Sequence, residues 1–595
     1  MRSLKFLILL ITLFASFVSF SQITIVGTVK DSQSQVRLSF CNIALKNSKR
    51  GTITNEDGVF SILVNLEKDT LLISYVGYAQ RVISAGEVMR SGVVLLTKKE
   101  VLLEEVTVHA TNDYLYELLD KCRKKMLEHP AEHVAKVYYG IQTQTREQPI
   151  ELLECYYNGY MQGPVLDKML LKNGRVALAE LDHYCFLTLH SSKGIISMDP
   201  VRRDDRYPSM PMQLGKREMH KVFILEAVPG DAEMLHVKFT PVKNPERDCS
   251  GELWIDRKSN TLVRTDVTIS NAAKHPFLPL FSVDTISHVD ITLSRTYRQE
   301  EGATLPDHIS FSYHVTYKSY RIQPDSLKGK VPANTSRDIY TSGIVCFYDY
   351  GEPFILPYFN YDPDYDDYRK ISIIPYNELF WDNNNTLLLT EKQKENLGFL
   401  AREGSLYTYE NKSYGRDFLM NLQVNGKKIF QNYYTFWSPV KRIALNREVS
   451  RSSPVPVVNK QNTVLSDLYN LKVQVLLDVN RINDTLSTRS YTVLDGKDSF
   501  FQLPEQPATR AFLNIWFDLC EMERMKMQAE LDTKSHTLEQ IDAIYKKTME
   551  GIDLLGKQYL KEVKLGGEER MLLKWNRMVL QELGIDNLAL FPLDK

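Results

Sequence analysis

A zinc-type motif lies in the first quarter of the chain. Residues 129–133 read His-Pro-Ala-Glu-His, the letters of the HxxEH motif, which needs both histidines on one face of a continuous helix. Proline disfavours the helical conformation of the residue before it, so Pro130 separates a helix ending near Glu128 from a strand beginning at Val134. We therefore expect no metal ion at this motif.

An acidic and aromatic segment has part of a calcium-loop pattern. Asp362, Asp364 and Asp366 have the 1, 3, 5 spacing, but Asp367 stands in place of the glycine and Ile373 in place of the bidentate glutamate. A solvated surface loop is the alternative that we favour over calcium coordination. Such a loop offers contacts to a sugar or a partner chain through Tyr361, Asp364, Tyr365, Asp366, Asp367 and Tyr368.

Catalytic signatures are scarce. The sequence contains no GxSxG, GxGxxG, P-loop or HExxH motif. Asp518, Glu521 and Glu523 share one predicted helix, where carboxylates usually face water or pair with a residue such as Arg524. We therefore expect a protein that is not an enzyme, with no catalytic residue and no cofactor.

The cysteines do not form a recognisable pair. Neighbouring cysteines are at least 30 residues apart, no CxxC occurs, and the count is odd. We expect most of them to be small buried hydrophobic residues: Cys41, Cys122, Cys155, Cys185, Cys249, Cys346 and Cys520.

Composition places the chain among globular proteins. Its 595 residues predict three to five domains, at about 100–200 residues per domain. The 73 Lys plus Arg balance 74 Asp plus Glu, which argues against nucleic-acid binding. The 32 tyrosines suit β-rich domains and recognition of carbohydrate or protein.

The N-terminus has the pattern of a signal peptide. Arg2 and Lys5 precede an apolar run over 6–20, and a small-x-small pattern at 19–21 predicts cleavage between Ser21 and Gln22. A retained membrane anchor is the alternative, but the run is shorter than the roughly 20 residues of a spanning helix. We expect an exported protein, periplasmic or associated with the outer membrane, with no transmembrane span after cleavage.

Short alternating strands follow the leader. The pattern predicts seven strands within 23–96, separated by turn signals about every ten residues, which is typical of a small β-sandwich. Three motifs, at 27–31 (GTVKD), 51–60 (GTITNEDGVF) and 74–78 (SYVGY), resemble the carboxypeptidase regulatory-like domain, a transthyretin-type sandwich of Gram-negative envelope proteins. The resemblance implies structural roles for Gly27, Asp31, Gly51, Asp57, Gly58, Phe60, Tyr75 and Gly77. It implies no peptidase chemistry, and no receptor-plug sequence follows.

The middle of the chain alternates over long stretches. After a helix capped by Asn112 or Asp113, strands are expected through about residue 345, with a hairpin turn at Asn173-Gly174. The hairpin around 251–264 resembles the half-barrel of periplasmic lipoprotein carriers, which hold acyl chains between a curved sheet and helices. A filled core is the alternative. If the core is filled, the apolar face of the strand over 261–269 packs inward. That face consists of Val263, Thr265, Val267 and Ile269.

The last third predicts strands followed by helices. We expect strands near 471–478 and 489–494, then helices over 510–531, 537–560 and 568–583. The fold class is multi-domain and mainly β: a seven-stranded sandwich, a larger antiparallel sheet domain, and a mixed α+β part ending in helices. The expected boundaries are 1–21 (signal peptide), 22–110 (sandwich), 111–130 (linker helix), 131–345 (sheet domain), 346–400 (irregular), 401–508 (β-rich) and 509–595 (helices).

These features predict an exported, non-catalytic binding or adaptor protein of the bacterial envelope, associated with the outer membrane. Its expected partners are envelope or outer-membrane proteins, with a glycan or lipid as further possibilities and no nucleic acid. A lipid or lipoprotein carrier would instead have a dry cavity under the middle sheet. A carboxylate-dependent hydrolase would have two carboxyl groups converging at about 5–10 Å.

Overall fold

The computed structural model describes most of the chain: residues 23–48, 50–99, 112–128, 132–181, 185–229, 233–300, 302–320, 335–384, 387–407, 423–424, 427–428, 433–444, 469–482, 485–501 and 505–593. The predicted signal peptide, the cleavage site Ser21–Gln22 and His129 lie outside these residues. Two compact units emerge, one of residues 1–170, 174–353 and 384–415 and the other of 171–173, 354–383 and 416–595. Within the described part, no helix is long and apolar enough to cross a membrane.

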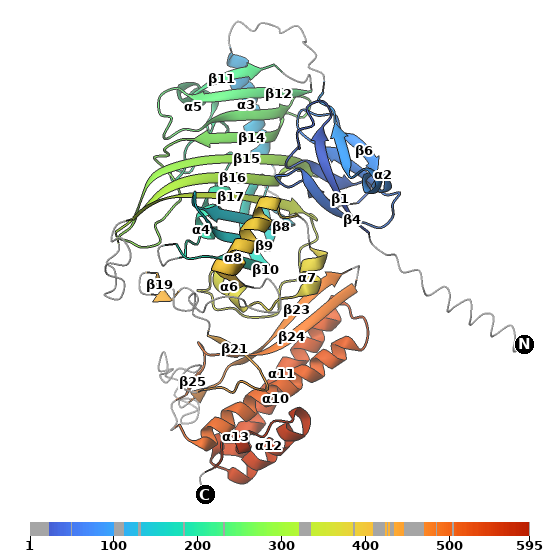
Figure 1. The fold of residues 1–595 in the computed structure, drawn as a ribbon, viewed down its shortest axis with the longest axis vertical. Helices are drawn as coiled ribbons and strands as arrows, with labels where there is room; N and C mark the ends of the chain where they lie inside the picture. Colours follow the sequence, from blue (N-terminus) through green and yellow to red (C-terminus); the bar gives the residue numbers. More distant parts are fainter. Residues whose placement is uncertain are drawn as a thin grey trace, which may run out of the picture. The chain divides into compact units, whose positions relative to one another are not determined.

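The first unit begins with the predicted sandwich (Figure 1, blue). Its two sheets have the strand orders β4-β1-β7 and β3-β2-β5-β6, so all seven predicted strands form. The sandwich also contains one helix, α2 (Ala85–Ser91), which packs against β1. The alternation of apolar and polar residues did not predict this helix. The strands are β1 (Ile23–Asp31), β2 (Asn42–Leu45), β3 (Gly51–Ile53), β4 (Val59–Val64), β5 (Thr70–Ser74), β6 (Arg81–Ser84) and β7 (Val93–Leu96).

Two glycines of the family motifs are required by the sandwich geometry. A Cβ at Gly27 would lie 2.8 Å from the Phe60 ring and 2.9 Å from Val88, so only glycine lets this ring fill the core. Gly58 has φ +70°, which the turn before β4 requires. Phe60 is fully buried as a result.

The middle of the chain forms one long antiparallel sheet of 11 strands, in the order β11-β12-β13-β14-β15-β16-β17-β8-β9-β10-β18 (Figure 1). The predicted antiparallel sheet domain is confirmed. The strands are β8 (Glu132–Gln144), β9 (Pro149–Gln162), β10 (Val165–Leu178), β11 (Phe223–Val228), β12 (Met234–Pro241), β13 (Ser250–Asp256), β14 (Thr261–Ile269), β15 (Thr285–Glu300), β16 (Ala303–Ser319), β17 (Thr335–Tyr348) and β18 (Ser405–Tyr407).

One predicted turn is wrong. Asn173 and Gly174 do not form a hairpin but lie inside β10, and Asn173 is buried. The chain reverses ten residues earlier, where Gly163 has φ +59°. An Asn-Gly pair favours a turn only where the flanking strands end, and here the strand continues through it.

Helices cover parts of this sheet. The predicted helix before the sheet domain forms as α3 (Asp113–Leu127). Strand β8 begins at Glu132, so Glu132 and His133 of the zinc-type motif lie on a strand, while residues 129–131 lie outside the described residues. The Tyr116 hydroxyl of α3 donates to the Phe223 carbonyl at 2.9 Å, which fastens the helix to β11. The other helices of this unit are α4 (Leu189–Ile196), η1 (Pro211–Gln213), α5 (Lys216–Val222) and α8 (Glu391–Glu403).

The second unit combines a small sheet, in the order β21-β24-β23, with a helical C-terminal part. The predicted strands and the three predicted helices all form, so the fold class is confirmed: mainly β, with helices at the C-terminus. The strands are β19 (Gln423–Val424), β20 (Lys427–Lys428), β21 (Tyr434–Phe436), β22 (Tyr469–Asn470), β23 (Val473–Ile482), β24 (Thr485–Asp495) and β25 (Phe500–Phe501). The helical elements are α6 (Asp367–Ile373), α7 (Glu378–Asn383), α10 (Pro507–Asp532), α11 (Leu538–Val563), η3 (Lys564–Gly566), α12 (Glu569–Leu583) and α13 (Asn587–Leu590).

The segment predicted to be irregular, 346–400, contains two short helices, α6 and α7, and most of a longer one, α8. Asp366 provides the N-cap of α6, and Thr390 provides that of α8. Helices α6 and α7, with seven and six residues, are too short for the hydrophobic repeat to stand out in an acidic and aromatic stretch. All seven cysteines are buried, as predicted.

Candidate functional site

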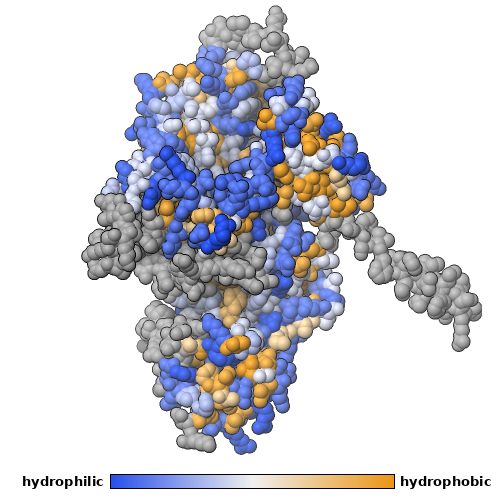
Figure 2. Space-filling model, in the orientation of Figure 1, coloured by the Kyte–Doolittle hydropathy of each residue, from blue (hydrophilic) through white to orange (hydrophobic). Residues whose placement is uncertain are grey.

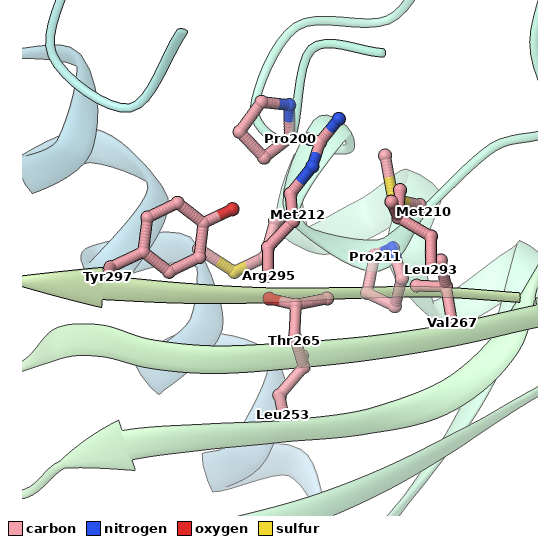
Figure 3. A pocket seen from close by; sticks show the side chains of 10 residues that line it. All are labelled: Pro200, Met210, Pro211, Met212, Leu253, Thr265, Val267, Leu293, Arg295 and Tyr297. Atoms are coloured by element: carbon pink, nitrogen blue, oxygen red, sulfur yellow. The ribbon is translucent and has the colours of Figure 1, made fainter. Parts of the chain in front are cut away.

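The inner face of the large sheet is where a carrier would hold an acyl chain. A cavity of about 10 Å³ lies there, between η1 and strands β13, β14 and β15. Figure 3 shows the side chains of η1 opposite Thr265 and Val267. The space has room for about one water molecule, beside the polar groups of Thr265, Arg295 and Tyr297. The lining residues are Pro200, Met210, Pro211, Met212, Leu253, Thr265, Val267, Leu293, Arg295 and Tyr297.

Strand β14 packs inward as predicted over most of its length. Thr265, Val267 and Ile269 are buried, with Val267 and Ile269 3% exposed. Val263 departs from the prediction: it is only half-buried and lines a cleft on the outer face, while Leu262 is fully buried instead. The register shifts at this point, because Trp254 pairs with Arg264 but Ile255 pairs with Leu262. A β-bulge therefore reverses the alternation.

The outer face of the same sheet carries a much larger space. A cleft of about 430 Å³ lies between the sandwich and the outer face of β14, β15 and β16. The sandwich stands beside these strands in Figure 1. The cleft is lined by Phe40, Asn42, Ser74, Tyr75, Val76, Met234, Val263, Arg264, Ser294, Thr296, Tyr297, Arg298, Asp307, His308 and Ser310.

Charged groups in this outer cleft are held by partners. The guanidinium of Arg264 makes two hydrogen bonds to Asp266, at 2.9 and 2.8 Å, and lies over the Trp254 ring. Burial alone would lower the pKa of Arg264, but the hydrogen bonds to Asp266 outweigh it and the pKa is raised, so the side chain stays cationic. The cleft therefore presents a fixed cation among aromatic and hydroxyl groups.

One carboxylate of the cleft joins the sandwich to the sheet. Asp307 is buried, and it accepts a hydrogen bond from the Asn42 side chain at 3.1 Å. His308 Nδ1 lies 2.9 Å from the same carboxylate. Among the described residues lining the cleft, Asp307 is the one carboxylate, so no pair of acids converges there.

A second polar site lies on the outer face of β15, β16 and β17. It is a groove of about 280 Å³, lined by Gln142, Gln144, Asp290, Thr292, Ser312, Tyr313, His314, Tyr340, Thr341 and Ser342. The outward surface of the strands in Figure 2 is largely hydrophilic. At one side, His288, Asp290 and His314 bring ligand atoms within 4.8 Å of one another.

Sequence reasoning missed this histidine cluster. His288 and Asp290 are two residues apart on one predicted strand, and that spacing places both on one face. His314 joins them only through the pairing of β15 with β16, where it lies opposite Asp290. The alternation of side chains along a strand could have placed His288 and Asp290 together. The pairing of β15 with β16, which brings His314 to them, cannot be predicted from one sequence.

The acidic and aromatic segment differs from its prediction in part. Tyr365 and Tyr368 are each 5% exposed, so their rings do not form an exposed stacking surface. Tyr365 packs in a core cluster of the second unit. Tyr361 is half-buried and contacts the same core. Contact through the polar residues stays a prediction: Asp364 and Asp366 are exposed and Asp367 is half-buried.

Two of the three aspartates of the calcium-type pattern have structural roles. Asp362 forms an ion pair with Lys497 and also accepts a hydrogen bond from the Asp364 backbone N–H. Asp366 caps α6 through the Arg369 backbone N–H, at 2.9 Å.

The carboxylates of α10 are more buried than predicted. Asp518 is fully buried rather than facing water, and accepts hydrogen bonds from Arg442, Trp437 and Asn587 at 2.7–2.9 Å. Glu521 pairs with Arg524 at 2.7 Å, as predicted. The difference arises because α10 is covered by neighbours on more than one side, whereas its sequence suggested an exposed face.

The motif residues of the sandwich occupy turns, strand ends and the core. Asp31 ends β1 and accepts the Tyr78 hydroxyl at 2.8 Å. Gly51 begins β3 and Gly77 has φ +83° in the turn after β5. Asp57 accepts the Glu391 backbone N–H at 3.1 Å, and Tyr75 lines the outer cleft.

A family model supports the predicted sandwich: the CarboxypepD_reg-like domain matches residues 25–108. No curated protein matches the chain.

Among solved structures, the chain is similar to a LolA superfamily protein from Nitrosomonas europaea (11% identity, 42% of this chain, 97% of that chain, TM-score 0.16). It is also similar to a DUF1329 family protein from Desulfovibrio piger (10% identity, 42% and 93%, TM-score 0.18). A third match is the Pseudomonas aeruginosa MucA/MucB complex (8% identity, 38% and 92%, TM-score 0.13). The expected likeness to lipoprotein-carrier proteins recurs among these matches.

Proposed function

We propose that this chain is an exported, non-catalytic binding protein of the cell envelope, associated with the outer membrane, which takes a peptide segment of a partner protein into the outer cleft. The observation that carries the proposal is the contrast between the two faces of one sheet. The inner cavity of about 10 Å³ has no room for an acyl chain, whereas the outer cleft measures about 430 Å³, within the range of about 300–1,000 Å³ typical of binding sites.

The chemistry of the outer cleft favours a peptide. Tyr75 and Phe40 provide aromatic contact area. Hydroxyl groups come from Ser294 and Thr296, which are alternate residues of β15, and from Ser310, which lies opposite Ser294 on β16. Extended peptides need this mixture, since their backbone requires hydrogen-bond partners and their side chains require apolar contact. Export is supported by the apolar leader and by the sandwich, whose family resemblance is to envelope proteins.

The described residues of the inner cavity and the outer cleft do not favour either alternative function. A carrier needs a dry cavity under the sheet, and a carboxylate-dependent hydrolase needs two convergent acids. The described lining of the outer cleft holds Asp307 alone, already bound by Asn42 and His308.

Site-specific photo-crosslinking tests the proposal. A photo-reactive phenylalanine derivative replaces Val76 on the sandwich wall or Thr296 on the sheet wall, and cells are irradiated before envelope extraction. The matched control is Val82, an apolar position of the same sandwich that is 56% exposed and outside the cleft. An inner-face probe replaces Met212.

We expect the same protein adduct from Val76 and Thr296 and none from Val82. Equal adducts from Val82, or no protein adduct from either wall, would contradict peptide binding in the cleft. A lipid adduct from Met212 would instead support the carrier function.

A further inference from the structure

The geometry points to a binding site for a divalent transition-metal ion on the outer face of the large sheet, with His288 Nε2, Asp290 Oδ2 and His314 Nδ1 as ligands. This site is separate from the outer cleft and goes beyond the proposed function. The three ligand atoms lie within 4.8 Å of one another. No other such group of histidine, cysteine or carboxylate residues occurs in the described part of the chain.

Strand register brings the three residues together. His288 and Asp290 are alternate residues of β15, so they share one face. Asp290 lies directly opposite His314 of β16, and His314 lies opposite Tyr340 of β17. The ligands therefore rest on the backbone of a continuous sheet, which fixes their Cα positions better than a loop would.

Hydrogen bonds orient both imidazole rings toward the common carboxylate. His288 Nδ1 lies 3.1 Å from Asn271 Oδ1, which leaves Nε2 facing Asp290 Oδ2 at 2.9 Å. His314 Nε2 lies 3.2 Å from Asp338 Oδ1, which leaves Nδ1 facing the same Asp290 oxygen at 3.4 Å. Metal-binding histidines usually donate their other N–H to a carboxylate or carbonyl in this way.

The remaining partners also hold the ligands in place. The other oxygen of Asp290 accepts the Asn271 backbone N–H at 2.9 Å. Asp338 accepts the Thr316 hydroxyl at 2.9 Å, and the His314 ring stacks on Tyr340 with centroids 4.6 Å apart.

Counting donors shows that two neutral imidazole rings cannot donate to every acceptor that faces them. Each ring faces an oxygen acceptor at both nitrogens, but a neutral imidazole has one N–H. If those N–H groups point to Asn271 and Asp338, two nitrogen lone pairs face the Asp290 carboxylate. A metal cation between the three atoms satisfies all of them at once.

The ligand types define the class of ion. Two imidazole nitrogens and one carboxylate oxygen suit Zn²⁺, Fe²⁺, Ni²⁺ or Cu²⁺ rather than Ca²⁺ or Mg²⁺, which prefer oxygen ligands alone. Three protein ligands leave at least one coordination position for water or a further ligand. Asp290 and His314 also line the groove of about 280 Å³, so that position is accessible from solvent.

Zn²⁺ titration of the chelator-treated, full-length mature protein tests the inference. We expect one Zn²⁺ per chain, with affinity at least about tenfold weaker in His288→Ala, His314→Ala and Asp290→Asn. Asp338→Asn should weaken binding by about 10–100-fold, as expected for a residue that orients a ligand. The matched control is His236→Ala, which removes a histidine of the same sheet that pairs with one carboxylate, Glu252, and should leave the affinity unchanged.

A second measurement does not depend on how the variants fold. Electron paramagnetic resonance of the wild-type protein with one Cu²⁺ bound should show coupling to two imidazole nitrogens. The inference is overturned if binding is not stoichiometric, if His288→Ala and His314→Ala bind Zn²⁺ as tightly as wild type, or if the Cu²⁺ signal shows fewer than two nitrogens. Those results would mean that hydrogen bonds alone hold the two rings around Asp290.

Discussion

At the scale of single residues, the buried carboxylate Asp518 shows how the C-terminal helices are held. Arg442 Nη1 lies 2.8 and 2.9 Å from its two oxygens, and the Trp437 and Asn587 side chains donate at 2.7 Å. Removing one member of such a buried group leaves an unpaired charge. We predict that Asp518→Ala destabilises α10 by about 3–5 kcal/mol, measured by hydrogen exchange of the full chain.

Glu523→Ala is the matched control, since Glu523 is on the same helix and pairs with the exposed Lys526. It should cost about 1 kcal/mol or less. Equal costs for both variants would show that the Asp518 contacts contribute nothing beyond those of a surface pair.

Asp31 predicts a pH dependence in the sandwich. The Ser34 backbone N–H, the Tyr78 hydroxyl and the Gln33 N–H hold the pKa of Asp31 well below its ordinary value, against the opposing effect of burial. Because the pKa is lower in the folded than in the unfolded state, the carboxylate stabilises the fold above about pH 4, and this contribution is lost as the pH falls toward the folded pKa.

We therefore predict that Asp31→Asn lowers the melting temperature most at neutral pH, and that the difference from wild type narrows below about pH 4. Tyr78→Phe, which removes one of the donors, should show the same trend with a smaller amplitude. Thermal melts across pH measure both, and a difference that stays constant with pH would contradict this role of Asp31.

At the scale of elements, β14 gives the sharpest contrast between its two faces. Val267 is 3% exposed on the inner face, whereas Val263 is half-buried in the outer cleft. We predict that Val267→Ala costs about 1–3 kcal/mol by leaving a cavity in a packed interior, and that Val263→Ala costs less. Urea unfolding of both variants measures this, and equal costs would mean that the inner face is not packed more tightly than the cleft.

Local patterns in the sequence predicted most of these elements, because alternation and capping depend on neighbours along the chain. The seven sandwich strands and the capping box at Thr537 are examples. The bulge that moves Leu262 inward was not predictable, since it depends on the pairing of β13 with β14. The burial of Tyr365 and the meeting of His288 with His314 were missed for the same reason: each depends on contacts distant in sequence.

At the scale of the whole molecule, the proposed function requires export. Signal peptidase needs small residues beside the cleavage site. We predict that replacing Ser19 and Ser21 together with leucine traps an uncleaved precursor, seen by immunoblot as a larger band. The control is Ser3→Leu. Ser3 lies before the apolar run and far from the cleavage site, so this variant should be processed normally. Normal processing of the double variant would contradict cleavage between Ser21 and Gln22.

We propose that the large sheet is a filled scaffold whose binding surface is its outer face. Native mass spectrometry of the mature protein, extracted from membranes in a mild detergent, tests it most directly. The 10 Å³ inner cavity predicts a measured mass equal to that of the polypeptide with no bound acyl lipid, and a lower melting temperature for Val267→Ala. A stoichiometric acyl lipid on the wild-type protein, with an unchanged melting temperature for Val267→Ala, would contradict the claim.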